Sequence, residues 1–285
     1  MKTFLVKFSA CLMSFFFMIC LVYYSNLYTY LLPNRGVYKA LTDSKKKNNK
    51  ARALIIGDSV GGQLFDPMNN DSSSVVSLAC NQAIDLVGHY ILLANSLQEN
   101  EQIEKVYFVY NPFSFRNNLD HEFTYNYFLK PFNIPEYRNL FTPNTLKQIE
   151  SVPFHKFSNL PPVAITFWTP EIKKETETQV FMSQISSEYL QKMINLTSSK
   201  GIEFKVISPP IRTSRKKEVE HLYRVAMAEK TTERFSQLFD NYFKDMLFLP
   251  DAEYIDPIHL NYPQKHVAIM LETYFDADKQ IAVSN

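Results

Sequence analysis

The sequence predicts an α/β domain with a mainly parallel sheet, preceded by one N-terminal transmembrane helix. Two observations indicate the domain: short, strongly apolar runs that end in turn residues, and helical patterns that separate these runs. Strands buried on both faces of a parallel sheet have this continuous apolar character. Strands that alternate with helices form right-handed βαβ units. A third observation, 27 uncharged residues near the N-terminus, predicts the membrane helix.

The predicted strands are short apolar runs, each followed by a turn or polar residue, at 53–57, 75–80, 105–110 and 203–208. The predicted helices have apolar residues every three or four positions and cover 85–99, 180–199, 215–247 (as two helices) and 264–275. Residues 112–170 interrupt this alternation with an insertion rich in aromatic residues and proline. We expect its aromatic side chains to fill the core and cover the sheet. Platforms on which sugars stack are the alternative.

The N-terminal segment 1–34 has the length and composition of a membrane anchor. Phe8 to Leu32 is mostly apolar or aromatic, and about 20 such residues span a bilayer core. A cleavable signal peptide is the alternative. Its apolar region is usually about 7–15 residues long, and a small-residue cleavage site follows it. The absence of such a site favours an uncleaved anchor.

Charge is divided unevenly along the chain. The whole chain has a formal charge of +1, but residues 1–52 hold nine Lys and Arg residues against one Asp, a net charge of +8. Residues 53–285 therefore have a net charge of −7, and the whole-chain charge near zero argues against nucleic-acid binding. We expect residues 35–51 to be a solvated basic tether that could lie against anionic headgroups.

The orientation in the membrane depends on two opposing features. Basic residues flank the anchor on both sides, and those that follow it favour a cytoplasmic domain under the positive-inside rule. Long C-terminal domains, however, translocate largely regardless of flanking charge. We therefore expect an N-terminus inside the cytoplasm and a domain outside it.

Residues that could perform chemistry follow the predicted strands, where active sites form in open α/β sheets. The first strand leads into Gly57-Asp58-Ser59. Ser59 could act as a nucleophile if a general base lay within hydrogen-bond reach. His259 is the candidate base, and Asp256, three residues earlier, could accept a hydrogen bond from its imidazole and orient it. These residues predict a Ser-His-Asp triad.

An oxyanion hole would complete this site, because acyl transfer develops negative charge on the carbonyl oxygen. Asn111 follows the third strand and could supply its side-chain amide, while the backbone near Asn81 could supply an N–H group. Each feature also has an ordinary structural interpretation. Gly-Asp-Ser is a common turn, Asp256 could cap a helix, and Asn111-Pro112 could simply end a strand.

The order of these blocks resembles the SGNH (GDSL-like) hydrolase superfamily over most of residues 52–276. The resemblance implies a three-layer α/β/α, flavodoxin-like fold in which Ser59 is the nucleophile, His259 the base and Asp256 the orienting acid. The sequence departs from the family pattern in two blocks. The glycine of the second block is absent and Asn81 occupies its place, and the third block keeps only Asn111.

These departures are similar to those of membrane-anchored members that take part in alginate O-acetylation or in D-alanylation of teichoic acids. The resemblance therefore implies a serine-dependent esterase or O-acyltransferase that acts on acyl esters of a cell-envelope glycan. A membrane acyltransferase is a further implied partner, and the lipid bilayer is a partner through the N-terminal helix. The competing hypothesis is a noncatalytic scaffold or glycan-binding protein in an envelope assembly complex.

Other chemistries have no motif in their favour. The sequence contains neither Cys-x-x-Cys nor His-Glu-x-x-His, so it predicts no metal site. It contains neither Gly-x-Gly-x-x-Gly nor a P-loop, so it predicts no nucleotide cofactor.

Overall fold

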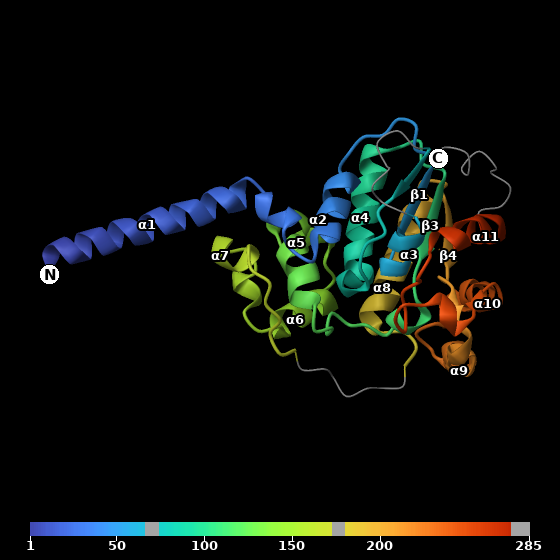
Figure 1. Ribbon diagram of the computed structural model, residues 1–285. Helices are drawn as coiled ribbons and strands as arrows, with labels where there is room; N and C mark the ends of the chain where they lie inside the picture. The colour runs from blue at the N-terminus through green and yellow to red at the C-terminus, as the bar shows by residue number, and fades with distance from the viewer. Residues whose placement is uncertain (66–73, 173–179, 275–285) are drawn as a thin grey trace.

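A parallel four-stranded sheet forms the centre of the computed structural model, which describes residues 1–65, 74–172 and 180–274 (Figure 1). The spatial order of the strands is β2-β1-β3-β4. They are β1 (Ala53–Gly57), β2 (Val75–Ser77), β3 (Lys105–Val109) and β4 (Glu203–Ile207). All four predicted strands are confirmed, and so is the α/β fold class with a parallel sheet and an N-terminal apolar helix. Strand β2 ends before Cys80, but the Cys80 N–H still donates a hydrogen bond to Gly57 O (2.9 Å).

The strand register brings the carboxyl ends of three strands to one level. Gly57 of β1 pairs with Val109 of β3, which in turn pairs with Ile207 of β4. The segments that follow these strands therefore leave the sheet at the same edge. This is the edge at which ligand sites form in open α/β sheets.

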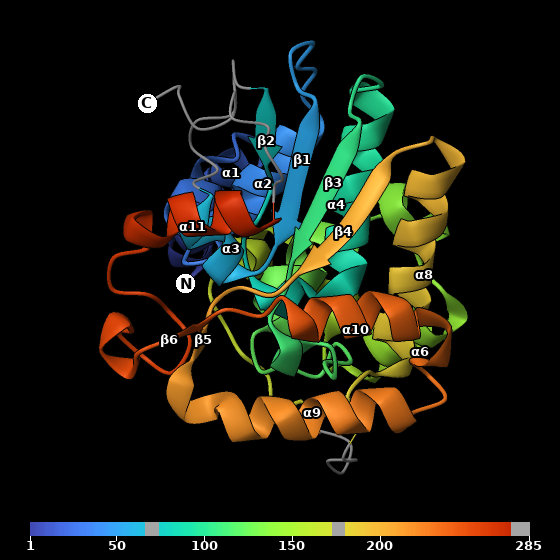
Figure 2. The ribbon, with the colours of Figure 1, turned by 90° about the vertical axis from the view of Figure 1, so that its right-hand side faces the viewer.

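Side chains that alternate along the strands bury two hydrophobic cores, one on each face of the sheet. Leu54 and Ile56 of β1 belong to the larger core, whereas Ala53 and Ile55 belong to the smaller one. The long helices that bury side chains in the larger core include α2 (Arg35–Ser44), α4 (Asp85–Glu99) and α8 (Gln184–Ser199) (Figure 1). Those on the smaller core are α3 (Ser59–Leu64) and α11 (Gln264–Tyr274) (Figure 2).

The predicted helices are present, with some boundaries adjusted. Helix α8 begins at Gln184, not at Val180, because the Ser183 hydroxyl accepts a hydrogen bond from Ser186 N (3.0 Å) and caps the helix there. The 215–247 segment forms two helices, as predicted, which are α9 (Lys216–Ala228) and α10 (Ser236–Lys244). Two short parallel strands, β5 (Ile211–Arg212) and β6 (Phe248–Leu249), flank this pair. Phe275, the predicted last residue of the final helix, lies outside the described residues.

The aromatic insertion forms short helical segments beside α2 and α4. They are a π-helical turn (Tyr125–Leu129), α5 (Lys130–Phe132), α6 (Pro143–Ser151) and α7 (Pro161–Ala164). The aromatic side chains fully buried in the core are Phe115, Tyr125, Phe128, Phe132 and Tyr137. Six of the insertion's thirteen aromatic residues, these five and Phe141, are thus buried in the core, as predicted, and two more pack against it, but a group near α7 is exposed.

The N-terminal helix α1 (Lys2–Tyr24) projects away from the domain (Figure 1). None of its side chains is buried, and it is long and apolar enough to cross a membrane. At about 1.5 Å per residue, 23 residues extend about 35 Å, which exceeds the roughly 30 Å of a bilayer core.

The predicted basic tether differs from the structure. Residues 35–44 form α2, which buries Val37 and Ala40 in the larger core. Two of the lysines, Lys39 and Lys46, form ion pairs with the buried Asp43. A helix with one apolar face therefore lies where the abundance of lysine suggested a solvated linker.

Candidate active site

Ser59 is the first residue of α3, directly after the turn that ends β1. The turn requires a glycine before it. A Cβ atom on Gly57 would lie 2.1 Å from the carbonyl oxygen of Val109 in the neighbouring strand. The close approach of two strands therefore explains Gly57, and the turn that follows places Ser59 at the carboxyl edge of the sheet.

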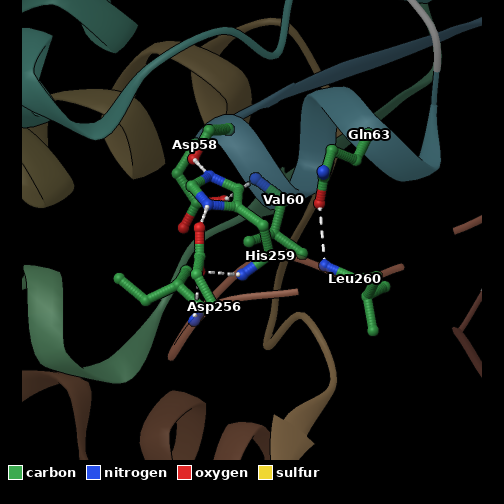
Figure 3. A network of polar contacts seen from close by, with 8 residues as sticks. Asp58, Val60, Gln63, Asp256, His259 and Leu260 are labelled. Atoms are coloured by element: carbon green, nitrogen blue, oxygen red, sulfur yellow. Dashed lines mark hydrogen bonds and ion pairs between the residues drawn. The ribbon is translucent and has the colours of Figure 1, made fainter. Parts of the chain in front are cut away.

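Asp58 fixes this turn through hydrogen bonds to three backbone N–H groups. Its Oδ1 atom accepts from Val60 N (3.0 Å) and Gly61 N (3.2 Å), and its Oδ2 atom accepts from Asn111 N (2.7 Å). The carboxylate thus caps α3, as its contact with Val60 shows (Figure 3), and it also connects α3 to the segment after β3. Burial raises the pKa of Asp58 to about 6, although these hydrogen bonds oppose the shift. The sequence analysis gave Asp58 no role.

Ser59, His259 and Asp256 form one chain of hydrogen bonds. Ser59 Oγ lies 2.9 Å from His259 Nε2, and His259 Nδ1 lies 2.7 Å from Asp256 Oδ2. The three predicted triad residues are therefore brought together, although Ser59 lies 200 positions before His259 in the sequence. An ionised Asp256 can only accept, so Nδ1 carries the proton and Nε2 is free to accept from the serine hydroxyl.

Asp256 is held in its ionised form by its own loop. Its Oδ1 atom accepts from both Ile258 N and His259 N, each at 2.8 Å (Figure 3). Slight burial acts to raise the pKa of Asp256, but the hydrogen bonds from the backbone and ring of His259 outweigh it and lower the pKa to about 2. The side chains of His259 and Asp256 are 34% and 46% exposed, so the base faces solvent and can meet a substrate.

Two further contacts position the histidine loop. Gln63 of α3 accepts a hydrogen bond from Leu260 N through its Oε1 atom (3.1 Å), which connects the serine helix directly to the residue after His259 (Figure 3). Within the loop, Ile255 N donates to His259 O (2.9 Å). The sequence analysis missed Gln63, since only its position one helical turn after Ser59 could have drawn attention to it.

The two predicted oxyanion residues lie at helix starts, and each uses its side-chain oxygen locally. Asn111 Oδ1 accepts from Phe113 N (3.0 Å), and Asn81 Oδ1 accepts from Ala83 N (2.8 Å). These contacts orient both side-chain amides and leave both Nδ2 groups without an acceptor among the described residues. Both asparagines thus keep a donor available beside the carboxyl edge of the sheet.

Ser59 adds a third available donor. The N–H groups of Val60, Gly61 and Gly62, which follow it in α3, all bind Asp58, the last through the Asp58 carbonyl (2.9 Å). The Ser59 N–H has no acceptor within the described part of the chain. An N–H group at a helix start with no partner is a common component of an oxyanion hole.

No protein-family model matches the chain, and no curated protein matches it. Among the described residues no group of three or more His, Cys, Asp or Glu side chains could hold a metal ion.

Proposed function

We propose that the protein is a serine-dependent esterase or O-acyltransferase with an SGNH-type, three-layer α/β/α domain. The observation that carries the proposal is the Ser59–His259–Asp256 chain of hydrogen bonds at the carboxyl edge of a parallel sheet. The strand order and the helices on both faces of the sheet are consistent with that fold.

In the proposed reaction, Ser59 Oγ attacks the carbonyl carbon of an acyl ester while its proton moves to His259 Nε2. Asp256 stabilises the resulting imidazolium. The Ser59 N–H, the Asn111 side-chain amide and a backbone N–H near Asn81 would stabilise the oxyanion. The intermediate collapses as the C–O bond to the leaving alcohol breaks and His259 protonates that alcohol. Water or a sugar hydroxyl then attacks the acyl-serine, so the product is a free acid or a new ester, and Ser59 regains its proton.

The proposed substrate is an acylated cell-envelope glycan, and a membrane acyltransferase is a proposed partner. This part of the proposal is supported by α1, which is long and apolar enough to hold the domain at a membrane. The proposed orientation has the N-terminus inside the cytoplasm and the domain outside, since long C-terminal domains translocate largely regardless of flanking charge.

The proposal is tested by hydrolysis of a short-chain nitrophenyl ester by the full chain in detergent. Ser59→Ala and His259→Ala should each lower kcat by on the order of 10³-fold or more, because triad members act as a unit. The matched controls are Ser199→Ala and His221→Ala, which replace exposed residues far along the chain and should leave kcat unchanged.

Undiminished turnover in both triad variants would refute the assignment. A folded wild-type protein that hydrolyses no ester would instead support the competing hypothesis of a noncatalytic scaffold in an envelope assembly complex.

A further inference from the structure

A group of exposed apolar side chains covers one end of the insertion. Among the described residues after position 35, nine large hydrophobic side chains are exposed, and five of them lie within residues 154–168. These five, which we name the insertion face, are Phe154 (60% exposed), Phe157 (49%), Leu160 (48%), Phe167 (39%) and Trp168 (41%). Soluble surfaces rarely concentrate large apolar side chains in this way, and such a patch indicates a partner or a membrane.

The insertion face lies beside the end of α1. Helix α7 packs against α1. Its Ala164 is buried in a small cluster with Tyr28 and Leu32, and Val22 and Tyr23 of α1 pack against this cluster. In Figure 1, α7 lies at the edge of the domain from which α1 projects. If α1 spans the bilayer, this end of the insertion is at the depth of the headgroups.

Buried polar side chains hold the insertion face in place. The side chain of Asn126, which is fully buried, forms two hydrogen bonds with the backbone of Trp168. Trp168 N donates to Asn126 Oδ1 (3.1 Å), and Asn126 Nδ2 donates to Trp168 O (2.6 Å). The same residue accepts a hydrogen bond from Asn34 Nδ2 through its carbonyl oxygen. Asn34 lies between α1 and α2, so Asn126 connects the segment that follows the anchor to Trp168.

Phe154 is exposed although its backbone conformation is unfavourable. Its φ of 60° lies in the left-handed region, which a bulky residue rarely adopts. Its carbonyl oxygen accepts hydrogen bonds from Tyr125 Oη (3.1 Å) and Phe157 N (2.9 Å), and these contacts maintain the conformation. The domain therefore presents this aromatic ring outward at a conformational cost, without burying it.

We propose that the insertion face is a second membrane contact, immersed in the interfacial layer of the bilayer that α1 crosses. Aromatic and leucine side chains favour this layer, and Trp does so especially. Two exposed tyrosines form the other half of the same belt: Tyr24 at the end of α1 and Tyr30 shortly after it. The proposal rests on the membrane-anchor part of the proposed function and not on its ester chemistry.

This contact would fix how the domain faces the membrane. Helices α2 and α4 lie on the side of the sheet toward α1, whereas α3, which carries Ser59, lies on the other side (Figures 1 and 2). The sheet then separates the bilayer from the proposed triad. A substrate would reach the site from the aqueous side and not from within the same leaflet.

Trp168 is the one tryptophan of the chain, so its fluorescence reports on the insertion face without labelling. The full chain is reconstituted in phosphatidylcholine–phosphatidylglycerol vesicles with and without brominated acyl chains. We expect brominated lipid to reduce Trp168 emission, and bromines near the headgroups to reduce it more than bromines near the bilayer centre.

The variant F157D/L160D, at two exposed positions, should lose this quenching and shift the emission to longer wavelength. The matched control Met227→Asp replaces an exposed apolar residue of α9, at the far side of the domain from α1, and should leave the quenching unchanged. Thermal unfolding of each variant establishes that the domain is folded.

Emission insensitive to brominated lipid in vesicle-embedded protein would overturn the proposal. Shielding of Trp168 from iodide without quenching by brominated lipid would also overturn it, because a protein would then cover the face. Release of the chain by alkaline carbonate would refute the anchor and this contact together. Quenched protein without esterase activity would refute only the proposed ester chemistry.

Discussion

Replacing Asp256 by asparagine should disable the proposed site while leaving its loop intact. Asparagine keeps an oxygen that can accept from Ile258 N and His259 N, as Asp256 Oδ1 does at 2.8 Å. It places an NH2 group where Asp256 Oδ2 now accepts from His259 Nδ1 at 2.7 Å. A donor at that position favours the imidazole tautomer with its proton on Nε2. That nitrogen then cannot accept the Ser59 proton.

The magnitude follows from the exposure of the carboxylate. Changing a buried triad aspartate to asparagine lowers kcat about 10⁴-fold. Asp256 is 46% exposed, so water can replace part of its electrostatic effect on the imidazolium, whereas the change of tautomer is unaffected. We therefore expect a loss of about 10³-fold, which corresponds to about 4 kcal/mol of transition-state stabilisation.

The assay is kcat for a nitrophenyl ester at pH 7 to 8, with thermal unfolding measured in parallel. The melting temperature of Asp256→Asn should match that of the wild type, because the backbone hydrogen bonds persist. An asparagine variant that retains kcat within about tenfold of the wild type would refute the orienting role of Asp256.

Three further predictions concern residues around the site and in the core. Asp85 is fully buried, and burial raises its pKa to about 7. The folded protein binds the proton of the Asp85 carboxyl group more tightly than the unfolded chain does. The free energy of unfolding should therefore fall as the pH rises from about 4 to 7. Asp85→Asn should remove this fall and be more stable than the wild type at pH 8, by up to about 4 kcal/mol in urea unfolding. Gln63→Ala should lower kcat about fivefold, because it removes the hydrogen bond to Leu260 N and one hydrogen bond contributes about 1 kcal/mol. Gln63→Glu keeps an acceptor at this position and should restore kcat. Equal kcat values in all three proteins would exclude a positioning role for Gln63. Gly57→Ala should destabilise the fold by about 3 kcal/mol or more, because its Cβ would lie 2.1 Å from Val109 O, and a normal melting temperature would contradict this.

The strands and the convergence of the triad were predictable from local patterns. Apolar runs that end in turn residues locate strands, and parallel strands place their carboxyl ends at one edge. Ser59 follows such a strand, and the Asp256–His259 spacing allows a hydrogen bond within one loop. These features sufficed to predict that the three residues meet, and the structure confirms the meeting.

The contacts that hold the site together were not predictable, because they join segments far apart in the chain. Asp58 binds the backbone of Asn111, and Gln63 binds that of Leu260. Nothing local to an aspartate or glutamine shows which distant N–H group it will meet. The asparagines were expected as oxyanion donors, but their additional capping bonds depend on the short helices that follow them.

Helix α2 shows how composition can obscure periodicity. The many lysines of residues 35–51 indicated a solvated tether, while Val37, Ala40 and Ser44 recur at helical spacing and are buried. The decisive contact is with α4, which lies about fifty residues further along the chain (Figure 1). Long-range packing of this kind determines whether a short amphipathic segment folds as a helix.

The most direct test of the central claim is covalent labelling of the folded full chain with a fluorophosphonate, followed by peptide mass spectrometry. A serine activated by His259 should form an adduct at Ser59, and that adduct should be absent in Ser59→Ala and strongly reduced in His259→Ala. A folded wild-type protein that forms no adduct at Ser59 would contradict the proposed enzyme and favour the noncatalytic scaffold.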